Sequence, residues 1–308
     1  MGGDGDAFID TLMKKSAEPI RFWNPYTAKV EEEDVYGERF LRFAYETSLG
    51  RVFLGALVKR AFFSKWYGWK MDQPGSVDKV EPFIRDYGIE MSDYTVPEGG
   101  FRHFNDFFYR KLSEGSRPIA EGDAVCPADG RHLGIPEIGR ESWLYAKGFQ
   151  FRLETLLAGT DFLNTWRSGA GLISRLCPVD YHRFHAPVSG RVSAIIDLEG
   201  PLFSVSPIAL RRNIDYLLTN KRKLVVIESP QMGRVGFIPV GATCVGSIVL
   251  SEEVGCEVEK GQELGYFRFG GSCVITLFEK GQIRLGGKFV EAQECEMEVY
   301  ERMGRSLV

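Results

Sequence analysis

The first 115 residues carry apolar side chains at helical rather than strand spacing. One helix is predicted to begin near Tyr36, because the next apolar side chains recur three or four positions apart, at Phe40, Phe43 and Ala44. The same spacing predicts three more helices, at 51–66, at 76–87, and over a shorter segment with Phe104, Phe108 and Leu112. We therefore expect a helical N-terminal region over residues 1–115.

The helix expected at 76–87 has a signal at each end. Ser76 is expected to be its N-cap, because a serine hydroxyl can accept one of the free N–H groups of the first turn. Gly88 is expected to end it, because glycine adopts the left-handed conformation at little cost.

From about residue 121 the pattern changes to short β-branched segments separated by glycines. Five strands are predicted there: Leu224–Glu228, Gly233–Val240, Val245–Leu250, Cys273–Phe278 and Phe289–Tyr300. Short helices are expected at 153–157 and 209–218. The predicted fold class is α+β, with the helical N-terminal portion packed on a β-rich catalytic core over 116–308.

Two stretches of this core resemble the halves of a biotinyl/lipoyl-type barrel, the barrel-sandwich hybrid. They are HAPVSGRVSAI at 185–195 and VEKGQELGYFRFGGS at 258–272, each with a turn glycine between β segments. Tight turns between short strands need positive φ, which glycine supplies. This resemblance predicts the fold of the core and says little about its function.

Charge and the N-terminus exclude some classes of protein. A formal net charge of −4 over 308 residues argues against electrostatic binding of nucleic acid. The N-terminal MGGDGDAFIDTLMKK is acidic where a secretory signal peptide is basic, and no apolar run approaches the ~18 residues of a transmembrane span. We expect a cytoplasmic protein that at most associates peripherally with a membrane.

Candidate chemistry begins with the string FGGSCV at 269–274, where a serine follows two glycines and enters an apolar strand. One interpretation is a simple turn. The other is an acyl shift, in which the Ser272 hydroxyl attacks the carbonyl of Gly271 and converts the peptide into an ester. Gly270 and Gly271 would permit a strained backbone and leave the carbonyl open to attack. Elimination and hydrolysis would then yield a pyruvoyl group on a new N-terminus.

A second string, DYHRFHAP at 180–187, holds two of the four histidines. His182 and His185 would share a face on a helix but point to opposite sides of a strand. The β-rich context and Pro187 favour the strand, so two separate functions are expected. A structural role remains the alternative, although the nearby Asp180 favours chemistry.

A third string, CPADGR at 126–131, is by itself no more than an Asp–Gly turn. In order, however, the three strings resemble the pattern of the phosphatidylserine decarboxylase family: a PADG-like aspartate, a YHRxH segment followed by proline, and a GS cleavage site. Upstream strings look like the N-terminal region of the family's soluble-type branch with a GGS site: RFWNPYTAKVEEEDVYGERFLRFAYE, FFSKWYGWKMD, and FNDFFYRKL followed by RPI. The resemblance covers about Arg21 to Tyr300.

This resemblance assigns roles to single residues. Asp129 and His185 match the charge-relay pair that activates the cleavage serine, Ser272, by the logic of a Ser-His-Asp triad. His182 matches the residue tied to decarboxylation, and Asp180 lies where it could orient that histidine. Cys273 departs from the Thr or Ser that is common after the cleavage serine, which leaves the expected cleavage intact.

The resemblance also implies a cofactor and partners. Cleavage between Gly271 and Ser272 would leave fragments of 271 and 37 residues (308 − 271 = 37) that stay associated. The covalent pyruvoyl group derived from Ser272 would form a Schiff base with phosphatidylserine, release CO2 and give phosphatidylethanolamine. No metal and no nucleic acid are implied, and a homodimer is left open.

Residues 49–70 mix cations with large aromatic side chains, as in a helix that lies at a membrane surface. Trp66 and Trp69 would occupy the headgroup layer, and Lys65 would face anionic lipids. The alternative is a helix that faces the core and has a solvated basic side. The sequence alone does not decide between them.

Three other functions compete with this interpretation. A pyruvoyl enzyme could decarboxylate a free amino acid instead of a lipid. A biotinyl/lipoyl carrier domain would need a modifiable lysine at a hairpin tip, and none is evident. A zinc hydrolase could use His182 and His185, but zinc needs three or four ligands and only His103, His132 and scattered acids remain.

Overall fold

The computed structural model describes residues 19–47, 49–50, 66, 68–142, 144–145, 149–242, 248–269 and 272–308. Its largest feature is one ten-stranded sheet, made of β1 (Arg21–Asn24), β2 (Lys29–Glu32), β5 (Gly130–Ile135), β8 (Ala170–Leu176), β10 (Gly190–Leu198), β11 (Arg222–Ser229), β12 (Gly233–Val240), β14 (Glu257–Val258), β16 (Ser272–Phe278) and β17 (Glu298–Glu301). The strand order is β14-β10-β11-β12-β16-β8-β5-β17-β1-β2. Neighbouring strands are antiparallel except β1 and β17, which are parallel.

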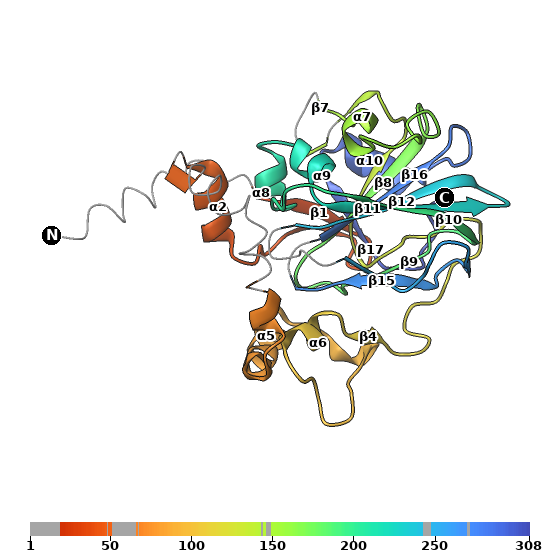
Figure 1. Cartoon of the computed structure of the whole chain (residues 1–308). Coiled ribbons are helices and arrows are strands. Elements are labelled where there is room, and N and C mark those ends of the chain that lie inside the picture. Colours follow the sequence, from red (N-terminus) through yellow and green to blue (C-terminus); the bar gives the residue numbers. More distant parts are fainter. Residues whose placement is uncertain are drawn as a thin grey trace.

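Smaller elements surround this sheet (Figure 1). Three further sheets contain β9 (Arg183–His185) with β13 (Ile248–Leu250) and β15 (Glu263–Phe267), β3 (Tyr94–Thr95) with β4 (Lys111–Leu112), and β6 (Glu141–Ser142) with β7 (Phe149–Gln150). The helices are α2 (Glu38–Glu46), α5 (Val80–Tyr87), α6 (Phe104–Phe108), α7 (Leu153–Leu156), α8 (Pro207–Leu210), α9 (Asp215–Thr219) and α10 (Gly287–Glu294), with 3-10 turns η1 (Pro74–Lys79) and η2 (Met91–Asp93).

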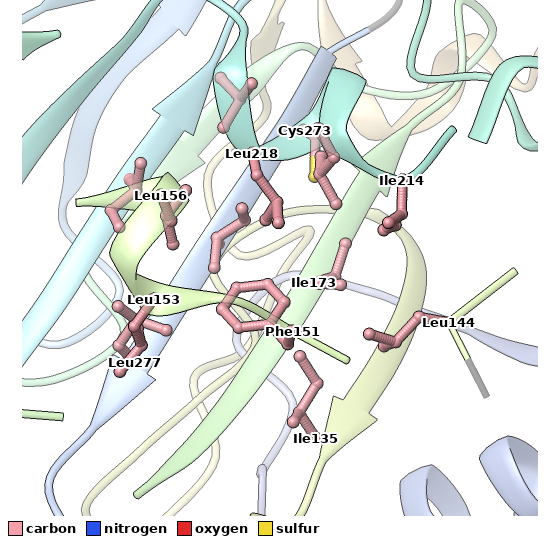
Figure 2. Packing of buried hydrophobic residues seen from close by; sticks show 14 of the residues in the cluster. Ile135, Leu144, Phe151, Leu153, Leu156, Ile173, Ile214, Leu218, Cys273 and Leu277 are labelled. Carbon is pink, nitrogen blue, oxygen red and sulfur yellow. The ribbon is translucent and has the colours of Figure 1, made fainter. Parts of the chain in front are cut away.

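Strand β16 separates two hydrophobic clusters because its side chains alternate between the faces of the sheet. Cys273, Ile275 and Leu277 point into one cluster, which α7 and α9 cover (Figure 2). Val274 and Phe278 point into the other, which side chains of β9 and β15 complete. The first residue of the strand therefore has the same orientation as Val274, toward the smaller sheet.

The expectation of an all-helical N-terminal region is wrong for residues 21–32 and for the short strand pair β3 and β4. Residues 21–32 form the antiparallel pair β1 and β2, and β1 adds to the main sheet beside β17. The partner strand lies at the other end of the chain, so local spacing could not reveal the pairing. Helix α2 confirms the helix predicted after Tyr36, whereas the helix predicted at 51–66 lies outside the described residues except for Trp66. A domain boundary at residue 115 stays a prediction.

The region predicted as the helix 76–87 divides into η1 and α5. Gly88 ends α5 as expected, in the left-handed conformation with φ of 58°. Ser76 is not the N-cap. Its buried hydroxyl hydrogen-bonds the carbonyl of Gln73 and accepts the N–H of Phe104, so it joins η1 to α6.

In the core, Gly233–Val240 is confirmed as β12, and the strand predicted at Cys273–Phe278 begins one residue earlier. The strand predicted at 289–300 is wrong in its first half, where α10 packs Phe289 and Ala292 against the sheet. The two stretches that resemble a biotinyl/lipoyl barrel do pair, β10 with β14 and β9 with β15. The described strands nevertheless form open sheets and no closed barrel, so the relation to that barrel stays a prediction.

Candidate active site

Ser272 is the first residue of β16, directly opposite Leu176 of β8. It is fully buried, and its Oγ has no hydrogen-bond partner among the described residues. A buried hydroxyl without a partner costs about 1–3 kcal/mol and calls for a functional explanation. Gly270 and Gly271, the other members of the predicted cleavage site, lie outside the described residues.

His182 lies just before β9 and is fully buried. Its Nδ1 is 2.9 Å from the backbone carbonyl oxygen of Asp180. A carbonyl only accepts, so Nδ1 carries a hydrogen, and Nε2 is the nitrogen left to exchange a proton. The ring centroid lies 3.8 Å from that of Phe108, which in turn lies 4.9 Å from that of Phe269. His182 therefore belongs to the aromatic cluster that holds the segment before Ser272.

Asp180 orients His182 through its backbone and not through its carboxylate. The carboxylate instead accepts hydrogen bonds from Arg131 Nη1 at 2.5 Å and from the Cys177 N–H at 2.7 Å. Burial raises the pKa of Asp180, and the positive charge of Arg131 opposes that rise. These contacts fix the turn that leads to His182.

His185 lies on the opposite side of β9 from the neighbouring Phe184, which packs between the two sheets. Its Nδ1 is 2.9 Å from the Gly261 carbonyl oxygen, and its Nε2 is 3.2 Å from the Tyr181 hydroxyl. Burial lowers the pKa of His185, and the Gly261 carbonyl together with the charges of Glu263 and Asp129 raises it again in part. His182 and His185 thus have different hydrogen-bond partners, and their separate functions stay a prediction.

Asp129, at the end of the segment before β5, forms an ion pair with Arg117. Arg117 Nη2 lies 2.7 Å from Asp129 Oδ2, and both side chains are almost completely buried. The Met303 N–H also donates to Asp129, at 2.8 Å. No hydrogen bond joins Asp129 to His185, or His185 to Ser272, in the described part of the chain. Asp129 therefore acts on His185 here through its charge alone.

Two cavities lie beside these residues. A polar cavity of about 390 Å³ contains Asp129, Asp180 and Tyr181 in its lining, together with the guanidinium groups of Arg117 and Arg131. An apolar cavity of about 170 Å³ is lined by residues that flank the candidate cleavage serine and by the N-terminal helix, among them Tyr36, Phe40, Leu176, Cys177 and Phe269. The two cavities thus flank the turn between β8 and His182.

Sequence reasoning missed several residues that build this site. Arg117 belongs to the quoted RPI string and Tyr181 to the DYHRFHAP string, yet neither was singled out. Phe108 contacts His182, which lies 74 positions later in the chain (182 − 108 = 74). Arg131 contacts Asp180, which lies 49 positions later (180 − 131 = 49). No local signal identifies such pairs.

Comparison with known proteins decides the family. A family model described as phosphatidylserine decarboxylase matches residues 104–305. The chain belongs to the phosphatidylserine decarboxylase family.

Similar members of the family are named phosphatidylserine decarboxylase proenzyme. The protein of Fusobacterium nucleatum is 37% identical over 289 residues, which cover 93% of this chain and 96% of that protein. The protein of Clostridium novyi is 37% identical over 294 residues, with coverages of 94% and 100%. That of Chlamydia trachomatis is 36% identical over 294 residues, with coverages of 95% and 98%. The family resemblance inferred from the short strings is confirmed.

The histidines weighed as zinc ligands have other contacts. His132 is buried between the Ser174 hydroxyl and the Glu301 carbonyl, and burial lowers its pKa to about 4. His103 caps α6, where its Nδ1 accepts the N–H of Asp106. Within the described ranges, no three His, Cys, Asp or Glu side chains gather as metal ligands.

The residues considered for membrane contact are partly described. Trp66 and Trp69 are exposed, by 45% and 59%, while Lys65 lies outside the described residues. In the ranges that the structure covers, no helix has the length and apolar character needed to traverse a bilayer.

Proposed function

We propose that the chain is a carboxy-lyase that decarboxylates phosphatidylserine to phosphatidylethanolamine after cutting itself between Gly271 and Ser272. Family membership supports the activity. The observation that carries the mechanism is the buried Ser272 hydroxyl, which has no partner in the described part and stands at the start of a strand. Relatives named as proenzymes agree with a chain that matures by cleavage.

The cleavage begins as an acyl shift. The Ser272 hydroxyl oxygen adds to the Gly271 carbonyl carbon, the C–N bond breaks, and the nitrogen keeps the proton that the hydroxyl lost. His185 takes and returns that proton, and the charge of Asp129 stabilises the protonated ring. A base then removes the Cα proton of residue 272, and the Cβ–O bond breaks to release the Gly271 carboxylate. Water replaces the nitrogen of the resulting dehydroalanine as ammonia and leaves a pyruvoyl group.

Serine at position 272 fits this cofactor, because its side chain lies at a strand end inside the protein and away from water. A pyruvoyl group supplies an electron-withdrawing carbonyl that stabilises the negative charge left when CO2 departs. We assign to His182 the protonation of the substrate carbon: the ring takes up a proton at Nε2, gives it to that carbon and returns to the form that carries a hydrogen on Nδ1 alone. Its Nδ1–H bond to Asp180 fixes the orientation of the ring.

The position of β16 supports a lasting association of the two fragments. Residues 272–308 supply β16 and β17 to the main sheet and α10, which packs against it. Strand β16 lies between β12 and β8 and pairs with both along its length. Removing it would open the middle of the sheet, so the 271- and 37-residue fragments should remain together (308 − 271 = 37).

Exposed aromatic side chains support a lipid substrate at a membrane surface. Trp66 and Trp69 are exposed, as is Phe40 at the rim of the apolar cavity, which is 51% exposed. Aromatic side chains of this kind favour the headgroup layer of a bilayer. We therefore infer peripheral membrane contact through this surface.

Phosphatidylserine in vesicles is expected to yield CO2, whereas free serine and free tryptophan are not. The double variant Trp66→Ala/Trp69→Ala should lose turnover on vesicles but keep it on a short-chain phosphatidylserine that is dispersed as monomers. We expect the double variant to bind vesicles about tenfold more weakly, which corresponds to a loss of about 1.4 kcal/mol in binding free energy. Release of labelled CO2 and vesicle sedimentation measure the two effects.

The matched control for this experiment is Val96→Ala/Val254→Ala, which removes two equally exposed apolar side chains (53% and 58%) elsewhere. Equal losses in both double variants would refute the membrane surface but leave the substrate assignment intact. Turnover of a free amino acid without turnover of the lipid would replace the proposed substrate.

A further inference from the structure

Asn105 is a fully buried polar residue on α6, and its side chain reaches the segment that leads to the cleavage site. Its Oδ1 accepts a hydrogen bond from the backbone N–H of Phe269 at 2.8 Å. Its Nδ2 donates to Asp72 Oδ1 at 2.8 Å and to the Gly68 carbonyl at 3.3 Å. One amide group therefore ties three separate segments together.

Phe269 is the last described residue before the cleavage site, and its side chain is anchored as well as its backbone. The ring is 4% exposed and packs on Phe104 and Phe108, with centroids 5.2 and 4.9 Å away. Asp72, which holds Asn105, also lies 3.6 Å from the guanidinium of the preceding Arg268. The approach to the cleavage site is thus attached to the helical layer.

The other side of the cleavage site is attached to the sheet. Ser272 begins β16, opposite Leu176, and Val240 pairs with the next residue. A hydroxyl that attacks its own preceding carbonyl must be held within a few tenths of an ångström of the reactive geometry, and a displacement of about 1 Å can cost 10²-fold in rate. Phe269 on one side of the cleavage site and Ser272 on the other must therefore both be held in place.

We propose that Asn105 is a positioning residue for self-cleavage: by holding the Phe269 N–H it fixes the N-terminal side of the segment that Ser272 attacks. This inference rests on the proposed cleavage between Gly271 and Ser272. Asn105 touches no reacting atom, and its action passes through the Phe269 backbone. Its loss should slow cleavage far more than it destabilises the fold.

The chain contains a matched control in Asn220, which is also fully buried. Its Oδ1 accepts the Phe203 N–H at 3.0 Å, and its Nδ2 donates to the Phe203 and Gly241 carbonyls at 2.8 and 2.9 Å. Asn220 therefore makes the same number of hydrogen bonds as Asn105, but none to residues next to the cleavage site. A purely structural role would give both residues the same effect.

The test follows cleavage of freshly translated full-length chain over time on a denaturing gel. Asn105→Ala is expected to slow the appearance of the 37-residue fragment by about tenfold or more, while Asn220→Ala cleaves at close to the wild-type rate. Thermal unfolding is compared in chains that also carry Ser272→Ala, so that all are uncut. There the two asparagine variants should lose similar stability.

A charge exchange keeps the test decisive if Asn105→Ala does not fold. Asn105→Asp places two carboxylates against each other and should slow cleavage. Adding Asp72→Asn should restore most of the rate, because amide and carboxylate then exchange places and the Phe269 N–H keeps its acceptor. Wild-type cleavage in Asn105→Ala, or no rescue by the exchange, would overturn the role of Asn105. A wild-type chain that never cleaves would instead overturn the proposed function itself.

Discussion

Replacing Ser272 with alanine is expected to leave the 308-residue chain uncut and to abolish decarboxylation. The substitution removes the only atom that can attack Gly271 in this account, and with it the origin of the pyruvoyl carbonyl. Because the Ser272 hydroxyl is buried without a partner in the described part, its removal should not lower the free energy of unfolding. A denaturing gel, a CO2-release assay and a thermal melt check the three expectations.

Thr276→Val is the matched control for this variant. Thr276 lies on the same strand and the same face, is fully buried, and its hydroxyl also has no partner among the described residues. The control removes a buried hydroxyl at nearly constant volume and should leave cleavage and activity unchanged. Full decarboxylation by the uncut Ser272→Ala chain would contradict the account, as would equal loss of activity in both variants.

Replacing His182 with glutamine is expected to leave cleavage intact and to lower kcat on phosphatidylserine by about 10²- to 10⁴-fold, the usual contribution of a general acid. The turn before β9 should persist, because the Asp180 carboxylate keeps its hydrogen bonds to Arg131 and to the Cys177 N–H, but glutamine cannot deliver a proton. The measurement combines fragment analysis with steady-state kinetics of CO2 release.

His185→Gln provides the opposite result, because His185 is assigned to the activation of Ser272. That chain should remain uncut, and it should therefore lack activity for a different reason. If both variants stop cleavage, or if His182→Gln retains wild-type kcat, the assignment of His185 to cleavage and of His182 to decarboxylation is wrong. The different contacts of the two rings, Asp180 and Phe108 against Gly261 and Tyr181, are the structural basis of this prediction.

Elements whose signals are local could be predicted from the sequence. The β-branched segment at Gly233–Val240 and the glycine that ends α5 both agree with the structure. The pairing of β1 with the main sheet could not be predicted, because its partner β17 lies 276 residues later (298 − 22 = 276; 299 − 23 = 276). Helix α10 was mistaken for strand because its few apolar side chains also suit a half-buried strand.

In the candidate site, too, residues with a local sequence signal could be predicted and residues that meet only in the folded chain could not. Asp129, His182, His185 and Ser272 could be proposed because each lies in a short string with a recognisable order. The residues that contact them could not be predicted from the sequence. Arg117 meets Asp129, Phe108 meets His182 and Asn105 meets Phe269 only in the folded chain. The two histidines have different partners, but only His185 lies on β9, so their placement on opposite sides of a strand stays a prediction.

The intact mass of the purified wild-type chain shows directly whether the chain cuts itself before Ser272. We expect two fragments in place of one chain: residues 1–271, and a 37-residue fragment that begins at position 272 and has no free amino group at its N-terminus (308 − 271 = 37). A single mass for all 308 residues, in a preparation that releases CO2 from phosphatidylserine at full rate, would contradict this expectation.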